Sequence, residues 1–376
     1  MNDQFLALLA PTPIAGPVQL GRDDLEKIKT IAKRRGLLML LHKRLADNMG
    51  NMEPAGEAAR FLKELEAVRL SGIARSIRQE NVQSEVSAIL SKADIPWIVL
   101  RGNAIARLLY HDPYCRVSAD IDLLIPRADV LSADKLFSGL GYRRGDTLPL
   151  NFWMNRIHHA VYIYPGTRSL IELHWNFGIP SYFRLTSEEI WAEVIPEESG
   201  QNGFSPEMTI IQLLIHHHMH AFRELKILVD ILWAFHKYDG TVEWKTLAAR
   251  LKNIGLMKTT LITLSQLMDL WKNLSSRMLS VTTVQQCLGE PVYRLPNYLQ
   301  SYFCMDIGRD YQFQSFKDSV MSRLALDSPE TICFSFVKSL FPMPGDIKAL
   351  YDDKRNWTLP FNYSRFITWR LAEWKK

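Results

Sequence analysis

Two short segments in which acidic and aliphatic residues alternate constrain the fold more than any other feature of the sequence. The first is Ser118-Ala119-Asp120-Ile121-Asp122-Leu123-Leu124-Ile125, and the second is Leu170-Ile171-Glu172-Leu173-His174. Because successive side chains of a β-strand point to opposite faces, Asp120 and Asp122 share one face, and so do Glu172 and His174. The aliphatic residues between them point into a core. The alternation therefore predicts two neighbouring strands with acidic residues on their polar side.

Further apolar stretches on either side of these segments predict additional strands. Residues 95–100 form an apolar run that ends at the turn Arg101-Gly102-Asn103, and we expect Asn103 to cap a helix that reaches Tyr110. Another helix is expected over 128–140. Residues 159–164 and 169–175 are separated by Pro165-Gly166-Thr167, which is typical of a hairpin turn. Together these strands predict a small mixed sheet.

Helical patterns dominate the rest of the chain. Residues 23–48 and 55–93 repeat their apolar positions with helical periodicity, and Ser205-Pro206-Glu207 stands in the order typical of a helix start. Residues 243–272 and 292–304 are further helical candidates. The predicted fold class is α+β, with a small mixed β-sheet core, flanking helices and a mainly helical second domain. We expect an N-terminal helical segment (1–93), the sheet core (94–200) and a helical C-terminal domain (201–376).

Charge and cysteine usage exclude several classes of protein. The chain has 45 basic and 40 acidic residues, which are interleaved, so the net charge of +5 favours anionic partners only mildly and argues against long nucleic acids. The four cysteines form no CxxC pair, which excludes a zinc knuckle or a disulfide framework and favours a reducing cytoplasm.

Membrane association is not expected from the hydropathy pattern. No apolar run approaches the roughly 18 residues of a membrane-spanning helix. The apolar stretch Phe5 to Ala10 follows Asp3 and is cut short by Pro11, so we expect no export signal and a cytoplasmic protein. The basic, aromatic tail over 366–376 could lie on a membrane surface, but packing against the body of the protein is the preferred interpretation.

The paired aspartates are the first candidates for chemistry. Two carboxylates side by side repel each other unless a cation lies between them, so Asp120 and Asp122 predict a site for Mg²⁺ or Mn²⁺. The simpler alternative is a solvated strand edge. Glu172 adds a third carboxylate from a neighbouring strand, and an acid within so apolar a run needs a partner. Three acids from two strands can hold two divalent ions, as phosphoryl transfer requires.

The turn before the aspartates is a candidate phosphate site. Gly102 lets a phosphate approach the backbone, and the helix that follows offers free N–H groups to an anion. Arg101 or Arg116 could pair with a triphosphate.

Four histidines lie close together at His216, His217, His218 and His220. His216 and His220 would share a helical face, which is compatible with a zinc site. No adjacent glutamate completes a protease-like motif, so we favour core packing with contacts from His216 and His220 to a phosphate. Asp230, on the following helix, is interpreted as a surface or capping acid.

These residues resemble the uncharacterised nucleotidyltransferase family of the DNA polymerase β-like superfamily. The similarity rests on Arg101-Gly102 after a strand, on Arg116, and on Asp120-Ile121-Asp122-Leu123-Leu124. It continues in Ile171-Glu172-Leu173-His174-Trp175 and in the helical segments Leu213 to His216 and Leu228 to Asp230. For Asp230 the resemblance implies, as the alternative, a role at the domain interface. The resemblance covers roughly residues 20 to 370, with its specific motifs within 98–230.

The resemblance implies a metal-dependent transferase that moves a nucleoside monophosphate (NMP) from a nucleoside triphosphate (NTP) to a hydroxyl and releases pyrophosphate. Asp120, Asp122 and Glu172 would hold the metals, and Arg101, Gly102 and Asn103 would cradle the triphosphate. The acceptor is unknown: a small molecule, a sugar, a protein side chain or a nucleic-acid end.

Two departures from the superfamily pattern keep alternatives open. Asn103 stands where serine is usual after the glycine, and Arg101 where relatives often have lysine. A catalytically inactive protein that binds a nucleotide or a partner is therefore the alternative function. A histidine-based metallohydrolase that binds zinc is the third.

Overall fold

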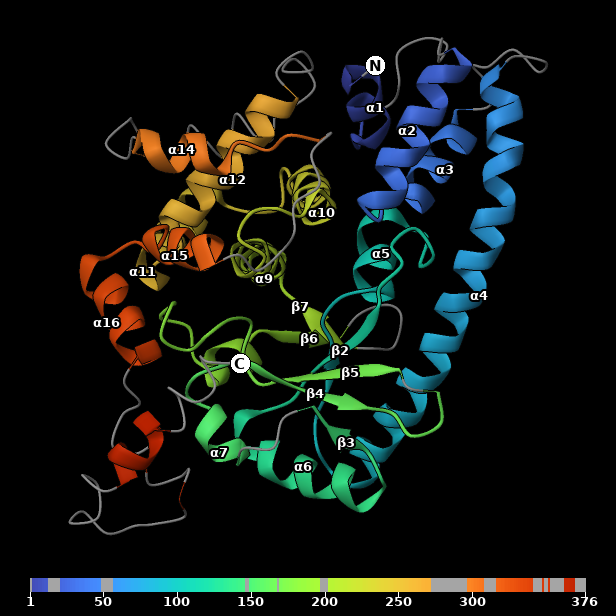
Figure 1. Cartoon of the computed structure of the whole chain (residues 1–376). Coiled ribbons are helices and arrows are strands. Elements are labelled where there is room, and N and C mark those ends of the chain that lie inside the picture. Colours follow the sequence, from blue (N-terminus) through green and yellow to red (C-terminus); the bar gives the residue numbers. More distant parts are fainter. Residues whose placement is uncertain are drawn as a thin grey trace.

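The computed structural model describes residues 2–12, 21–48, 57–145, 149–167, 169–196, 202–271, 296–307, 316–340, 347, 351 and 362–368. In Figure 1 a sheet with short helices forms one end of the molecule, helices form the other, and the long helix α4 runs beside both. The helices are α1 (Asn2–Leu9), α2 (Arg22–Arg34), α3 (Leu38–Asp47), α4 (Glu57–Lys92), α5 (Asn103–Tyr110), α6 (Val130–Gly139), α7 (Leu150–Trp153), α8 (Ser187–Trp191), α9 (Pro206–Met219), α10 (Leu225–Lys237), α11 (Trp244–Ile254), α12 (Met257–Leu270), α14 (Asn297–Phe303), α15 (Phe316–Leu324) and α16 (Pro329–Leu340). The strands are β1 (Ile98–Val99), β2 (Asp120–Leu124), β3 (Arg143–Arg144), β4 (His159–Ile163), β5 (Leu170–His174), β6 (Val194–Pro196) and β7 (Asn202–Phe204).

The predicted mixed sheet is confirmed. Its five strands lie in the order β1-β2-β5-β4-β3. β2 and β5 are parallel neighbours, whereas β1 pairs with β2, and β4 with both β5 and β3, in antiparallel fashion. The expected hairpin joins β4 to β5. The small sheet of β6 and β7 was not predicted, because these three-residue strands carry no alternating pattern long enough to read.

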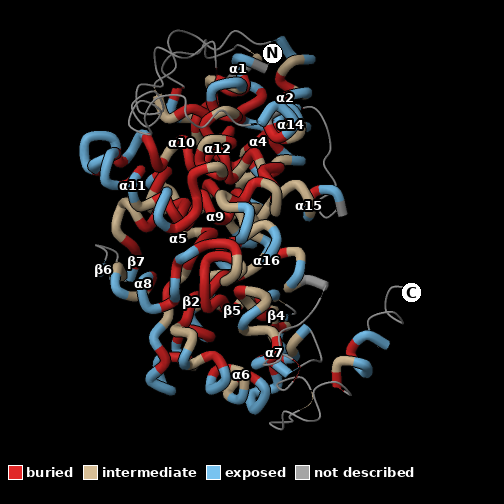
Figure 2. The backbone as a smooth tube through the Cα atoms, turned by 90° about the vertical axis from the view of Figure 1, so that its left-hand side faces the viewer, coloured by how far each residue is buried: buried red, intermediate tan, exposed pale blue. Residues whose placement is uncertain are grey.

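Two hydrophobic clusters hold the molecule together. One lies between the sheet, α6 and the C-terminal half of α4, and it contains Leu123, Phe137, Leu173 and Trp175. The other joins the N-terminal helices α1 to α3 with α5 and with α9 to α12. Figure 2 shows this buried interior passing from α10 through α9 to β2 and β5. The sheet therefore presents one end directly to the helical half, although the boundaries at 93/94 and 200/201 stay predictions.

Helix boundaries differ from the sequence interpretation at two glycines. Residues 23–48 form two helices, because Gly36 adopts φ +66°, and the N–H of Leu37 donates to the carbonyl of Ala32 at 2.8 Å. Residues 243–272 are divided likewise at Gly255, with φ +79°. A residue in this left-handed conformation, together with the bond that spans it, ends a helix in a Schellman motif.

The helix start predicted at Ser205 is confirmed. Ser205 Oγ accepts the N–H of Met208 at 3.2 Å, and Pro206 occupies the first turn of α9. No helix among the described residues combines the length and apolarity needed to cross a bilayer. In the tail, Phe366 packs near Phe152, as expected, with ring centroids 6.5 Å apart. Residues 369–376 lie outside the described part of the chain.

Candidate active site

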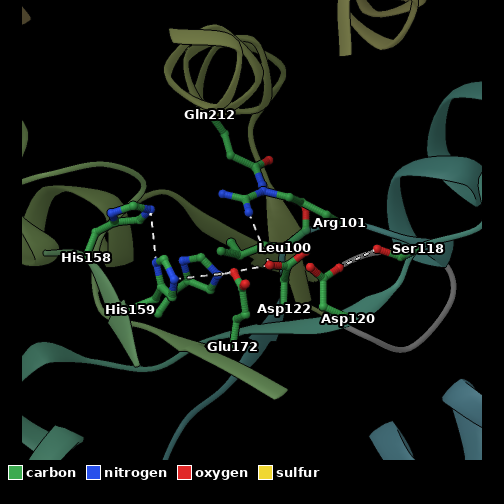
Figure 3. Close-up of polar contacts among 10 residues, drawn as sticks. Leu100, Arg101, Ser118, Asp120, Asp122, His158, His159, Glu172 and Gln212 are labelled. Atoms are coloured by element: carbon green, nitrogen blue, oxygen red, sulfur yellow. Dashed lines mark hydrogen bonds and ion pairs between the residues drawn. The ribbon is translucent and has the colours of Figure 1, made fainter. Parts of the chain in front are cut away.

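The register of two parallel strands brings the predicted carboxylates together. Asp122 of β2 lies opposite Glu172 of β5, and Asp120 lies two positions earlier on the same face of β2. Figure 3 shows the three side chains on one side of the sheet, beneath the helix that carries Gln212. The common face predicted from the alternation is therefore present.

The turn at Arg101 is held over the aspartates by hydrogen bonds from two elements. The N–H of Leu100 donates to the carbonyl of Asp122 at 3.0 Å, and Gln212 of α9 donates to the carbonyl of Leu100 at 2.7 Å. Gly102 has φ +63° and ψ −126°, a conformation that only glycine adopts readily. α5 begins directly after it, at Asn103. Gly102 and Asn103 thus line the same pocket as the two aspartates.

Asp122 is surrounded by cationic groups. Its Oδ1 accepts from Arg101 at 3.1 Å and lies 2.9 Å from Nε2 of His174. Burial opposes ionisation of this carboxyl, but the charge of Arg101 and the hydrogen bond from His174 outweigh burial and hold the pKa of Asp122 well below its usual range. Burial lowers the pKa of His174, whereas its hydrogen bonds to Asp122 and Glu172 raise it, and the net shift is upward. The contact with His174 therefore favours the ionised form of Asp122.

Glu172 lies among histidines. Its Oε2 is 3.3 Å from Nε2 of His174 and 3.7 Å from Nε2 of His159. Burial raises the pKa of Glu172, but the hydrogen bond with His174 and the nearby imidazoles lower it further, so Glu172 is ionised at neutral pH. His159 in turn contacts His158, with Nδ1 3.2 Å from Nε2.

Asp120 has a different environment from its two partners. Its Oδ1 accepts the hydroxyl of Ser118 at 2.7 Å. Burial, followed by the negative charges of Asp122 and Glu172, raises the pKa of Asp120. The pocket beside Gly102 and the two aspartates has a volume of about 20 Å³, which holds one ion or water molecule but not a nucleotide.

The side-chain oxygen and nitrogen atoms at this site are suited to bind a divalent cation. One ligand atom from each of Asp122, Glu172 and His174 lies within 4.8 Å of the other two. Among the described residues, Asp120 belongs to no set of three side chains with this spacing. Its Oδ1 instead accepts the hydroxyl of Ser118. Carboxylate oxygens suit Mg²⁺ and Mn²⁺, and the adjacent imidazole nitrogen adds a borderline ligand.

The interpretation of Asp230 as a surface or capping acid is wrong. Asp230 is fully buried, accepts from Nε of Arg116 at 2.8 Å and accepts the hydroxyl of Tyr110 at 2.6 Å. These bonds join α10 to α5 and to the segment before β2, so the alternative role, at the interface between sheet core and helical half, is the observed one. Arg116 is only 3% exposed, and its charge is compensated by Asp230.

The four clustered histidines have separate surroundings. His217 bonds to Gln266 and His218 to Thr259, at 2.8 and 2.7 Å. His216 of α9 and His220, the residue directly after that helix, lie close together, as predicted, with ring centroids 4.5 Å apart. Burial, followed by the charge of Arg101, lowers the pKa of both, that of His220 to about 3. Within the described ranges no group with metal-ligand spacing contains any of the four, so the metallohydrolase interpretation finds no support.

Several residues of the site were given no role from the sequence. They are Ser118, His158, His159, His174 and Gln212. The alternation that placed His174 beside Glu172 could have assigned it to the site, and the adjacent pair His158-His159 at the start of a predicted strand was a second signal. Gln212 gave none, because its contact spans 112 positions of the chain.

A comparison with protein families agrees with this arrangement. The family model described as "Uncharacterised nucleotidyltransferase" matches residues 22–271, roughly two thirds of the chain. The match covers the sheet, the carboxylates and helices α9 to α12, and it ends well before the position near 370 expected from the resemblance. No curated protein and no solved structure matches the chain significantly. On this match, the chain belongs to the uncharacterised nucleotidyltransferase family.

Proposed function

We propose that the protein transfers an NMP group from an NTP to a hydroxyl of an acceptor and releases pyrophosphate. Membership of a nucleotidyltransferase family supports the general class of reaction. The observation that carries the proposal is the register that sets Asp122 beside Glu172, with Asp120 on the same face and the Arg101-Gly102-Asn103 turn next to them.

Asp120, Asp122 and Glu172 would hold Mg²⁺ or Mn²⁺. Such ions, when bound, neutralise the triphosphate and favour ionisation of the attacking hydroxyl. The acceptor oxygen forms a bond to the α-phosphorus while the bond from that phosphorus to the bridging oxygen breaks, and the electron pair leaves with pyrophosphate. Glu172, ionised at neutral pH, would take the proton of the acceptor hydroxyl, and His174 would orient Glu172 and Asp122.

The turn and the basic residues around it would bind the triphosphate. Gly102 and Asn103 offer backbone N–H groups at the start of α5. Ser118 supplies a hydroxyl in the same pocket, and it would replace the hydroxyl of the serine that the superfamily usually has at the position of Asn103. Arg101 pairs with Asp122 in this structure, so we propose that it turns toward the phosphates once a cation neutralises Asp122. That movement would also enlarge the pocket.

Two histidines of the helical half would complete the phosphate site as neutral hydrogen-bond donors. His216 and His220 lie near enough to Arg101 for its charge to shift their pKa values. We propose that these two histidines contact the nucleotide from the C-terminal end of α9. Arg116 is committed to Asp230, so its proposed contribution to nucleotide binding is to fix the segment that precedes β2. The cytoplasm remains the proposed compartment.

One observation favours the alternative of a binding protein without catalysis. Arg101 and His174 already neutralise Asp122, which is the arrangement expected of a site that has lost its metal. The two functions differ in one product. A binder is stabilised by an NTP but releases no pyrophosphate.

A thermal-shift screen of the four NTPs with Mg²⁺ and Mn²⁺, followed by a pyrophosphate-release assay, tests the proposal. Asp120→Asn is the sharper variant, because Asp122→Asn would also break the bonds to Arg101 and His174. Asp94→Asn, an identical change at an exposed position, is the matched control. We expect release by the wild type and the control, and at least a 100-fold loss in Asp120→Asn. Stabilisation by an NTP with no release from the wild type would establish the binder instead.

A further inference from the structure

Three imidazoles meet beside the carboxylates, at the junction of β4 and β5. His159 and His174 are directly paired across the two strands. His158 precedes β4, and its carbonyl accepts the N–H of Trp175 at 2.9 Å. The ring centroids of His158, His159 and His174 are 4.5, 4.9 and 5.5 Å apart, and Figure 3 shows His158 and His159 side by side at the edge of the site. We call these three residues the histidine cluster.

The nitrogens of the histidine cluster have the spacing of metal ligands. One ring nitrogen from each residue lies within 4.8 Å of the other two. A tetrahedral zinc ion with Zn–N bonds of about 2.0–2.1 Å would place its ligand nitrogens roughly 3.4 Å apart. Small rotations about the side-chain bonds close that difference. Pairing of β4 with β5 fixes the backbones of His159 and His174, and the bond from Trp175 fixes that of His158, so ligation requires only rotation of the rings.

Two of these imidazoles have buried nitrogens that lack a hydrogen-bond partner. His158 is 8% exposed and His174 is 0% exposed, and Nδ1 of each is unpaired within the described part of the chain. A buried polar atom without a partner costs about 1–3 kcal/mol. In His158 and His174 the other ring nitrogen, Nε2, makes the contacts with His159 and Glu172. The unpaired Nδ1 atoms are therefore a cost of burying these rings, whereas the ligand spacing points to a metal ion.

Glu172 completes a four-ligand set around the cluster. Its Oε2 lies 3.3 Å from Nε2 of His174 and 3.7 Å from Nε2 of His159. Three nitrogens and one oxygen are a donor set that zinc and similar transition metals prefer, whereas Mg²⁺ selects oxygen ligands. We propose that the histidine cluster, with Glu172, binds a transition-metal cation of the zinc class, at a position adjacent to the proposed Mg²⁺ site, with which it shares Glu172.

Cobalt binding followed by visible absorption tests the proposal without any turnover. The full-length protein is prepared without a polyhistidine tag, stripped with EDTA and titrated with Co²⁺ in the presence of excess Mg²⁺. Cobalt on nitrogen ligands gives a visible absorption band, so the band reports the cluster itself. We expect one equivalent of Co²⁺ to bind, and Mg²⁺ not to displace it.

Variants decide which residues hold the ion. His159→Gln removes one ligand at a half-buried position that tolerates the change, and we expect cobalt affinity to fall at least 10-fold. His236→Gln, at an exposed position on α10, is the matched control and should bind as the wild type does. No cobalt band in the wild type, or equal affinity in His159→Gln, would overturn the proposal and leave the cluster as a hydrogen-bonded relay. Asp120→Asn should keep the band, so loss of transferase activity and loss of this site are distinguishable.

Discussion

Replacing Asp230 by alanine should destabilise the protein strongly, because this residue compensates a buried charge. Asp230 is 0% exposed and Arg116 3%, with Nε and Oδ2 2.8 Å apart. The substitution leaves the guanidinium of Arg116 buried without a counter-ion. Breaking a buried ion pair from one side costs about 3–5 kcal/mol. The hydroxyl of Tyr110, which donates to Asp230 at 2.6 Å, also loses its acceptor.

Two other substitutions should lower the free energy of unfolding less than Asp230→Ala and serve as references for it. Tyr110→Phe removes one hydrogen bond but keeps the ion pair, so it should cost only about 1 kcal/mol. Asp239→Ala removes an exposed carboxylate just beyond α10 and should change the free energy of unfolding by less than about 0.5 kcal/mol. The loss should be largest in Asp230→Ala, which leaves a buried charge unpaired, smaller in Tyr110→Phe, which removes one buried hydrogen bond, and smallest in Asp239→Ala, at an exposed position.

Urea denaturation followed by circular dichroism measures the three free energies of unfolding. Total stability of about 5–15 kcal/mol is usual, so Asp230→Ala should lower the denaturation midpoint by a large fraction. A loss below about 1 kcal/mol in Asp230→Ala, or equal losses in Asp230→Ala and Asp239→Ala, would refute the reasoning. It would then follow that Arg116 is hydrated, and free to serve a ligand.

Other consequences of the structure can be measured in the same way. Gly102→Ala should lower stability by about 1–3 kcal/mol, because φ +63° with ψ −126° strains any side chain, although the new Cβ would meet Ser118 Cβ only at 3.6 Å; an unchanged melting temperature would contradict this. Ser205→Ala should cost about 0.5–2 kcal/mol through loss of the α9 cap, measured by urea denaturation. Burial lowers the pKa of His218 to about 3 in the folded chain, whereas its pKa in the unfolded chain is near 6.5. The neutral imidazole therefore leaves the free energy of unfolding undiminished above pH 6.5, and this free energy falls as pH decreases toward 3, because the unfolded chain binds a proton that the folded chain does not. The slope of stability between pH 6 and 4 should therefore decrease in His218→Gln by about 1 kcal/mol per pH unit, and a parallel profile would exclude this account.

Local patterns were sufficient to predict the strands that carry the chemistry. Alternation of acids and aliphatic residues indicated β2 and β5 and the shared face of Asp120 and Asp122, since the strand repeat is a property of the backbone itself. Helix starts with a strong local signal, such as Ser205-Pro206, were predicted equally well. Gly36 and Gly255 were not recognised as breaks, because a single glycine within a periodic pattern is compatible with either outcome.

Contacts between distant segments could not be predicted from the sequence. Asp230 on an amphipathic helix resembles a surface acid until its partners Tyr110 and Arg116, more than 110 positions away, are known. The same holds for the ion pair of Arg101 with Asp122, which turns an expected phosphate ligand into a counter-ion. Tertiary structure decides which charges are free to bind a ligand and which already stabilise the fold.

Transfer of a radioactive label tests the central claim most directly. The protein is incubated with each NTP labelled at the α-phosphate, with Mg²⁺, in the presence of fractionated cell extract that supplies small-molecule, protein and nucleic-acid acceptors. Metal-dependent NMP transfer predicts label on one fraction with the wild type and with Asp94→Asn, and none with Asp120→Asn or Glu172→Gln. Label transferred equally by all four proteins, or by none of them with any of the NTPs, would contradict the account.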